Sequence, residues 1–150
     1  MSKEIYVTNT ECQMNDGRVE IHLYGRTADN EAEHVVVEGF EPYFYVRPEE
    51  AEEISAFDHE NIDSFEETEF VDVKEQEDLV KVVLDNPYAM RGVADLFEEH
   101  FEADVDPTNR FRIDNDLKTG VRVDGDRVRV ESIEVVEMEA PPRVMTFDIE

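Results

Sequence analysis

The chain has 150 residues, and its 40 Asp and Glu against 14 Lys and Arg give a formal net charge of −26. This length is sufficient for one domain of average size, or for one small domain and part of a second. Hydrophobic residues make up 40% of the chain, which is enough for a core and excludes wholesale disorder. No apolar run approaches the roughly 18 residues of a membrane span, and the N-terminus lacks a secretory signal. We therefore expect a cytoplasmic protein that enters no membrane.

The acidic residues run evenly from Glu4 to Glu150 and form no separate tail. In molar salt the Debye length falls to about 3 Å, so a surface covered by carboxylates becomes tolerable. Lysine is also rare, with four lysines against ten arginines. We interpret this composition as adaptation to a salt-rich cytoplasm, with an ordinary acidic domain as the alternative. In a halophile the net charge would not exclude a nucleic-acid partner.

The first segment, residues 1–39, predicts an antiparallel β meander. An apolar strand at 5–7 precedes a turn at 15–17, and residues 19–24 alternate between apolar and polar as in a half-buried strand. A second turn at 27–30 leads to a strand at 34–37, which ends at Gly39.

The second segment, residues 40–106, predicts a ferredoxin-like unit. Pro48 and the Asn86-Pro87 pair are typical helix starts. The order strand, helix, strand, strand, helix, strand is that of the βαββαβ unit, in which two helices cover an antiparallel sheet. The expected strands are 43–46, 70–73, 79–84 and 103–105, and the expected helices are 49–58 and 87–100.

The third segment, residues 107–140, predicts a helix and a β-hairpin that complete the N-terminal domain. The turn at 106–109 begins a helix through 110–113, and Gly120 ends it. The hairpin would join residues 121–123 to 128–138. The expected fold class is therefore α+β, with an antiparallel meander and a ferredoxin-like unit.

The last segment, residues 141–150, follows a Pro-Pro break and predicts a buried apolar strand that ends in Asp148-Ile149-Glu150. Side chains two residues apart on a strand point to the same side, so both carboxylates would project together. Such a pair can bind Mg²⁺ or Mn²⁺ for phosphodiester hydrolysis. Because the chain stops inside this predicted strand, we expect it to be the beginning of a longer protein.

Four motifs, in this order along the whole chain, resemble family B DNA polymerases, especially the archaeal members. They are Phe40-Glu41-Pro42-Tyr43-Phe44-Tyr45, Asp85-Asn86-Pro87 before a helix, Arg110-Phe111-Arg112-Ile113-Asp114, and the strand from Val144 that ends in Phe147-Asp148-Ile149-Glu150. The resemblance implies the N-terminal domain of such a polymerase, followed by the first strand of an RNase H-like 3′–5′ exonuclease domain. Together with the acidity, it suggests a haloarchaeal source.

The resemblance also implies two sites. Asp148 and Glu150 would be catalytic residues and metal ligands of the exonuclease, with Mg²⁺ or Mn²⁺ in the parent protein. The fragment alone should hold no metal and be inactive, because the other ligands would follow residue 150. The second site is a pocket that captures uracil in the single-stranded template of archaeal members. Its lining here would be Pro42, Tyr43, Pro87, Met90, Val105, Arg110 and Phe111.

In this pocket Arg110 would hold the adjacent phosphate, and Tyr43 and Phe111 would form flat walls for the flipped base. Met90 and the Asp106-Pro107 pair differ from the residues that are usual in the family. The expected function is template handling in a DNA-directed DNA polymerase with proofreading. The expected partners are single-stranded template DNA and, for the parent, a sliding clamp, while the fragment itself would be a monomer.

Other interpretations remain open from the residues alone. The chain could be a free-standing ferredoxin-like binding or regulatory module of a halophile. A small metal-dependent nuclease would need more carboxylates near Asp148 than the sequence places there. Arg110 could simply pair with a carboxylate, and Tyr43 could belong to the core. Cys12 is the one cysteine, which excludes an internal disulfide, and the four histidines lack metal-ligand spacing and are interpreted as surface residues.

Overall fold

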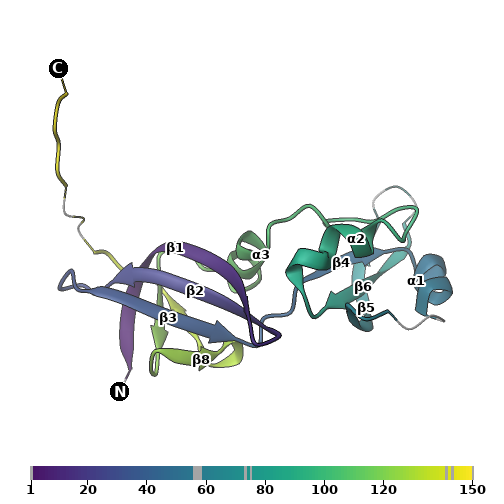
Figure 1. The fold of residues 1–150 in the computed structure, drawn as a ribbon, viewed down its shortest axis with the longest axis horizontal. Helices are drawn as coiled ribbons and strands as arrows, with labels where there is room; N and C mark the ends of the chain where they lie inside the picture. The colour runs from purple at the N-terminus through teal and green to yellow at the C-terminus, as the bar shows by residue number, and fades with distance from the viewer. Residues whose placement is uncertain are drawn as a thin grey trace.

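The computed structural model describes residues 2–55, 59–72, 74, 76–140, 142 and 144–149. In Figure 1 the described residues up to 140 form two lobes that lie side by side along the long axis. Within this described part, the first lobe is built on a six-stranded sheet of order β8-β3-β2-β1-β7-β9. The second lobe is built on a three-stranded sheet of order β4-β6-β5. The predicted α+β class with antiparallel sheets is confirmed.

The first sheet begins with the predicted meander. Strands β1 (Lys3–Asn15), β2 (Arg18–Arg26) and β3 (Ala32–Glu38) pair antiparallel in chain order. Asp16 and Gly17, both with positive φ (50° and 75°), make the tight turn between β1 and β2. Two central residues with positive φ match the right-handed twist of the flanking strands, which explains the short connection.

The late strands do not form the predicted hairpin. Strands β7 (Gly120–Val123) and β9 (Glu134–Val136) pair antiparallel, and β7 also pairs with β1. Between them, β8 (Arg127–Arg129) runs parallel to β3 at the opposite edge of the sheet, followed by the 3₁₀ turn η2 (Val130–Ser132). The prediction of one hairpin over 121–138 was wrong, because residues 127–129 find their partners on β3 rather than on β7.

Charge pairs help to hold β8 at that edge. Arg127 Nη1 donates to Glu20 Oε2 and to Glu38 Oε1, both at 2.6 Å. Glu20 is buried, with 4% of its surface exposed, and its second oxygen lies 3.1 Å from His22 Nε2. The hydrogen bond from Arg127, and then the one with His22, lower the pKa of Glu20 below its ordinary value.

We expect Glu20→Gln to lower the free energy of unfolding by about 1 kcal/mol at neutral pH, a value discounted because Arg127 is half exposed. A carboxyl whose pKa is lowered by folding stabilises the fold above its unfolded value, near 4.5, and loses this contribution as the pH falls. The difference between variant and wild type should therefore shrink below pH 4.5. Thermal unfolding at neutral and acid pH measures it, and Glu31→Gln, which removes the same charge at an exposed position, should show no such loss.

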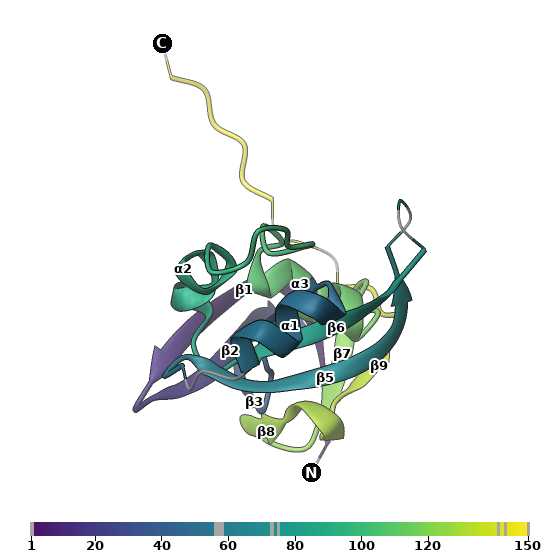
Figure 2. The ribbon, with the colours of Figure 1, turned by 90° about the vertical axis from the view of Figure 1, so that its right-hand side faces the viewer.

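The second lobe follows the predicted order up to its second helix. Strand β4 (Tyr43–Val46) leads into α1 (Pro48–Ser55), and β5 (Ile62–Val71) and β6 (Asp78–Leu84) pair antiparallel. Strand β6 also pairs antiparallel with β4. Asn86 Oδ1 accepts a hydrogen bond from Tyr88 N (2.9 Å), which caps the turn η1 (Pro87–Ala89) that leads into α2 (Met90–Ala94). Figure 2 shows α1 lying over β5 and β6.

Several helices and strands of this lobe begin or end at other residues than predicted. Strand β5 begins at Ile62, well before the predicted residue 70. Helix α2 ends at Ala94 instead of residue 100, and Leu96, which lies within the predicted helix, is 44% exposed. The first helix is described only to Ser55, and the predicted residues 56–58 lie outside the described residues.

The last strand of the predicted ferredoxin-like unit, at 103–105, is not formed. The described residues there are turns and bends, and the only pairing is an isolated bridge between Phe101 and Tyr45. Glu102 adopts a positive φ of 63°, which turns the chain away from the sheet edge directly after the bridge. Asp106 then caps α3 (Pro107–Asp114), because its Oδ1 accepts from Thr108 N at 2.9 Å. The start predicted for this helix is confirmed.

Alternation along β4 separates two apolar clusters in the second lobe. Phe44 and Val46 point to the helix side, and Tyr43 and Tyr45 point to the opposite, open face of the sheet. The cluster on the helix side consists of Phe44, Val46, Ala51, Val82, Leu84, Met90, Val93, Ala94 and Phe97. Because the helices cover only one face, the other face is available to α3 and to ligands.

Residues 144–149 do not form the predicted buried strand. They pair with no strand in the described part of the chain, and in Figure 1 they extend away from the first lobe. Their large apolar side chains are between 72% and 84% exposed: Val144, Met145, Phe147 and Ile149. A strand needs a neighbour for its backbone hydrogen bonds and a partner layer for its apolar face, and the described residues supply neither.

Candidate functional site

The open face of the second sheet and helix α3 enclose a cavity of about 620 Å³, which we name the aromatic hollow. Its lining is rich in aromatic side chains, with Arg110 as the one cation among its described lining residues. The lining consists of Tyr43, Tyr45, Phe70, Val71, Asp72, Leu79, Phe101, Glu102, Arg110, Ile113 and Asp114. Tyr43 and Tyr45 reach it because alternate residues of β4 face the same side.

Arg110 connects α3 to the second sheet. Its guanidinium carbon lies 4.7 Å from the centroid of the Tyr43 ring, and its Nη2 donates to Glu102 Oε2 at 2.8 Å. Asp114, one helical turn later, lies 4.0 Å from Arg110 Nη1 and accepts a hydrogen bond from the Tyr43 hydroxyl at 2.9 Å. Lys81 Nζ lies 4.1 Å from the centroid of the same ring. Two cations therefore lie against one tyrosine at the edge of the hollow.

The protonation states in the hollow follow from burial. Burial, and then the hydrogen bond to Asp114, raise the pKa of Tyr43, so its hydroxyl stays a neutral donor. Burial alone would lower the pKa of Arg110, but the hydrogen bond to Glu102 and the nearby charges outweigh it and raise the pKa. The buried Nε of Arg110 has no hydrogen-bond partner within the described part of the chain. The hollow is therefore lined by a fixed positive charge, and one N–H group of this guanidinium has no partner among the described residues.

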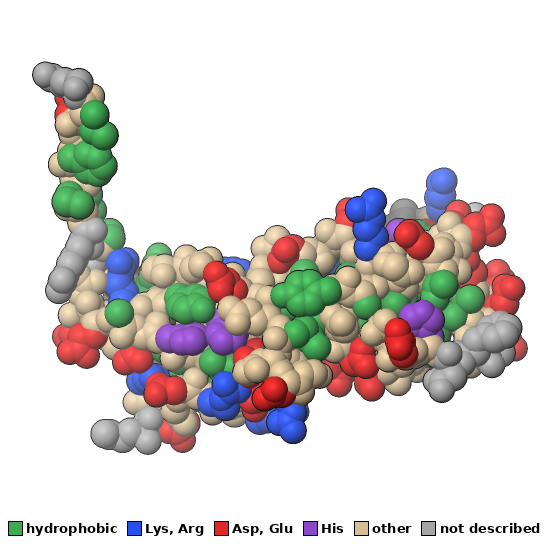
Figure 3. All heavy atoms as spheres, viewed as in Figure 1, with side chains coloured by type: hydrophobic (Ala, Val, Ile, Leu, Met, Phe, Trp, Pro, Cys, Tyr) green, Lys and Arg blue, Asp and Glu red, His purple; other side chains and the backbone are tan. Residues whose placement is uncertain are grey.

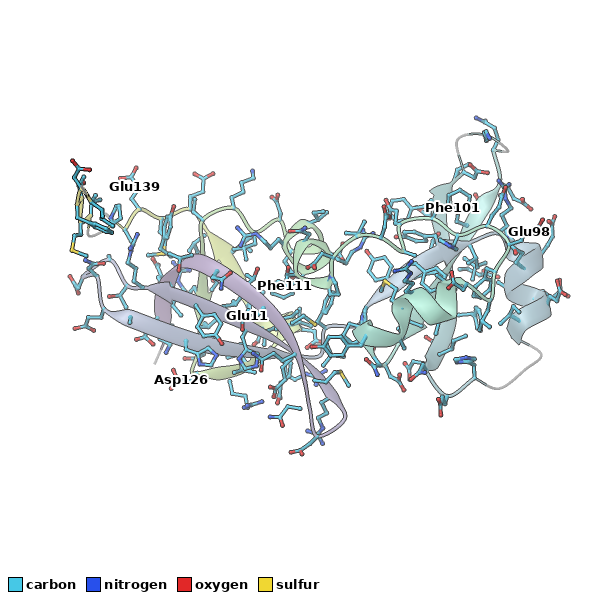
Figure 4. All side chains as sticks on the ribbon, turned by 45° about the horizontal axis from the view of Figure 1, so that its top comes forward. Glu11, Glu98, Phe101, Phe111, Asp126 and Glu139 are labelled. Carbon is cyan, nitrogen blue, oxygen red and sulfur yellow. The ribbon has the colours of Figure 1, made fainter. Side chains whose placement is uncertain are left out.

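Of the seven residues predicted for a base pocket, the structure brings Tyr43 and Arg110 together. Pro42 is buried, and its carbonyl accepts from Leu84 N at 2.9 Å. Met90 belongs to the core of the second lobe, and Phe111, labelled in Figure 4, belongs to the core of the first. These three side chains line none of the hollows described here.

The other two predicted residues line separate hollows. Pro87 borders a cavity of about 450 Å³ between the lobes, together with Cys12 and Asp106. Val105 borders another hollow, beside Asp106 and Arg112. Burial raises the pKa of Cys12 to about 11, so its thiol stays protonated and unreactive near neutral pH. The seven residues are therefore distributed over three hollows and the buried interior.

Sequence reasoning missed most of the aromatic hollow. Tyr45 is not among the residues predicted for the pocket, although its alternation with Tyr43 indicates that both face the same side of β4. Phe70 and Phe101 come from distant segments, and Phe70 is 64% exposed. No local pattern predicts that these two rings line the same hollow, because their segments come together only in the folded structure.

Of the two predicted metal ligands, the structure describes Asp148 alone. Asp148 is exposed on the unpaired segment, and Glu150 lies outside the described residues. In the part of the chain that the structure describes, no three His, Cys, Asp or Glu side chains are arranged to hold a metal ion. Among the described residues, Asp148 therefore has none of the further ligands that a two-metal hydrolytic centre requires. Likewise, none of the described helices has the length and apolar character needed to cross a bilayer.

Comparisons with known proteins identify the fold. No protein-family model matches this sequence, and neither does any curated protein sequence. Among solved structures, the chain is similar to the family B DNA polymerase from the hyperthermophilic archaeon Pyrobaculum calidifontis, with a TM-score of 0.70 and 18% sequence identity. The match covers 93% of this chain and 21% of the polymerase chain, so this chain spans about a fifth of the length of the polymerase. The chain therefore has the fold of a segment of an archaeal family B DNA polymerase.

Proposed function

We propose that this chain is the template-handling N-terminal domain of a DNA-directed DNA polymerase of family B with 3′–5′ proofreading activity. The observation that carries the proposal is the likeness in fold over 93% of the chain, and the order of the four sequence motifs supports it. Nucleotidyl transfer and exonuclease chemistry would reside in the rest of the parent protein, with Mg²⁺ or Mn²⁺. A sliding clamp, a cytoplasmic location and a haloarchaeal source belong to the same proposal.

We place single-stranded template in the aromatic hollow. Proteins that bind single strands combine aromatic rings, on which bases stack, with cations that hold the backbone. Phe70 offers an exposed ring, and Arg110 offers the positive charge of a guanidinium that lines the hollow. Glu102, which pairs with Arg110, is 50% exposed, so an incoming phosphate can displace it at low cost. Molar salt would screen the repulsion between template and the remaining carboxylates.

Uracil sensing is the finer part of the proposal. A flipped uracil would differ from thymine by the missing methyl group, so a tight slot beside Tyr43 and Arg110 would prefer uracil. The guanidinium of Arg110 supplies a donor for a carbonyl oxygen of the base, and the hydroxyl oxygen of Tyr43, whose hydrogen is donated to Asp114, can accept from the N3–H of the base. The preference would be lost if the base stacked on the exposed Phe70 alone, because every base has a π face.

Fluorescence anisotropy in molar KCl tests this function. We expect a labelled single strand with one uracil to bind more tightly than its thymine counterpart. Arg110→Ala should weaken the binding by about 1–3 kcal/mol, the range for a lost specific Arg contact. Arg91→Ala is the matched control, since it removes the same charge from an exposed position on α2 and should leave binding unchanged.

The possible results test uracil sensing, template handling and the polymerase assignment separately. Equal binding of the two strands would contradict uracil sensing alone. No binding of any single strand by a chain shown to be folded by circular dichroism would contradict template handling. Reading the coding DNA past Glu150 tests the polymerase assignment itself: an open frame of several hundred codons is expected, and a stop codon there would favour a free-standing binding module.

A further inference from the structure

Two histidines meet on the first sheet, away from the aromatic hollow. His22 Nδ1 on β2 lies 2.7 Å from His34 Nε2 on β3, and the ring centroids are 4.9 Å apart. The register pairs Tyr24 with His34, so His22 is the diagonal neighbour of His34 on the same face. His22 is 8% exposed and His34 is exposed. In Figure 3 histidine side chains form a patch on the near face of the first lobe.

Neighbouring groups fix the orientation of both rings. Tyr24 stacks on His34, with centroids 4.5 Å apart and ring planes 9° from parallel. His22 Nε2 lies 3.1 Å from Glu20 Oε1, and an ionised carboxylate only accepts, so Nε2 carries the hydrogen. The lone pair of His22 then resides on Nδ1 and points at His34. Arg127 holds Glu20 in place at 2.6 Å.

We propose that His22 and His34 form a binding site for a divalent transition metal ion, of the Zn²⁺ or Cu²⁺ class, with water as the remaining ligands. Imidazole nitrogen is a preferred ligand of these ions. Zn–N bonds of about 2.0–2.1 Å in tetrahedral geometry hold two nitrogens roughly 3.3 Å apart. The rings therefore need to separate by about 0.6 Å, which the exposed His34 side chain can provide by a small shift along the face of Tyr24 that keeps the two rings stacked.

The protonation of the two histidines and the charges around them are compatible with a bound metal ion. In the metal-free pair, Nε2–H of His34 donates to Nδ1 of His22; on binding, Nε2 loses this proton and Nδ1 of His34 takes one up, so His34 ligates as a neutral imidazole. Glu20 then acts as the carboxylate that orients a metal-bound histidine. Glu11, opposite His22 on β1, and Asp126, which interacts electrostatically with His34, add negative charge around the pair. Both are labelled in Figure 4.

Water must complete the coordination, because no three His, Cys, Asp or Glu side chains among the described residues form a metal site. Binding by carboxylates alone is the competing explanation for any metal uptake, since the chain has 40 Asp and Glu. The experiment must therefore detect nitrogen ligands. The other two histidines, His59 and His100, serve as matched controls.

Electron paramagnetic resonance of the 150-residue chain with one equivalent of Cu²⁺, in molar KCl at neutral pH, tests the site. We expect nitrogen superhyperfine splitting that is lost in His34→Gln and retained in His59→Gln and His100→Gln. Zn²⁺ titration against a chromophoric chelator should show about tenfold weaker binding for Glu20→Gln, the lower end of the usual effect of removing such an orienting group. A wild-type spectrum without nitrogen ligands would overturn the proposal. So would a nitrogen signal that persists in a folded His34→Gln variant, since the ligand would then lie elsewhere.

Discussion

Replacing Phe111 by alanine is expected to lower the free energy of unfolding by about 3–5 kcal/mol. Its side chain is fully buried and packs edge-on against Phe40, with ring centroids 5.9 Å apart. Removal of the ring leaves a cavity between α3 and the first sheet that the strands cannot close. Urea denaturation in molar KCl, followed by circular dichroism, measures the loss. Ile113→Ala on the same helix is the control; Ile113 is 65% exposed, so its effect should stay within about 0.5 kcal/mol.

This measurement also decides what Phe111 does. As a wall of a base pocket, it would tolerate truncation with little loss of stability, and the variant would lose its preference for uracil. As a core residue, it destabilises the whole lobe when truncated. A Phe111→Ala variant that keeps wild-type stability would therefore contradict the packing described here.

Transfer from molar to millimolar KCl is expected to unfold the chain. With a net charge of −26 the acidic side chains repel one another, and Figure 3 shows them spread over both lobes. The Debye length grows from about 3 Å at 1 M to about 30 Å at 0.01 M, so repulsion that is screened in molar salt acts across the whole molecule in dilute buffer. Far-UV circular dichroism along a KCl series gives the midpoint of this transition.

A variant with fewer acidic side chains tests whether charge repulsion causes the dependence of folding on salt. Glu49, Glu52 and Glu53 are exposed on α1, and their joint replacement by glutamine removes three charges without touching the core. We expect the variant to remain folded to a lower KCl concentration than the wild type. A wild-type chain that stays folded in 0.01 M salt would instead favour an ordinary acidic domain.

The fold explains why the aromatic hollow and the histidine pair are two separate features. The hollow lies on the open face of the second sheet, where Tyr43 and Arg110 meet. The histidine pair lies on the first sheet, held by the register of β2 and β3. Arg110→Ala and His34→Gln should therefore act independently, since the two features share no contact among the described residues.

Local sequence patterns predict several of the elements correctly. The alternation in the meander predicted β1 to β3, and Asn86 and Asp106 predicted the starts of η1 and α3, because turns and caps depend on neighbouring residues. Only the tertiary structure decided which distant segments pair. Strand β8 joins β3 instead of β7, Phe101 forms a bridge in place of a strand, and His22 meets His34. These outcomes depend on register and burial across the sheets, and no pattern within a few residues of the chain encodes them.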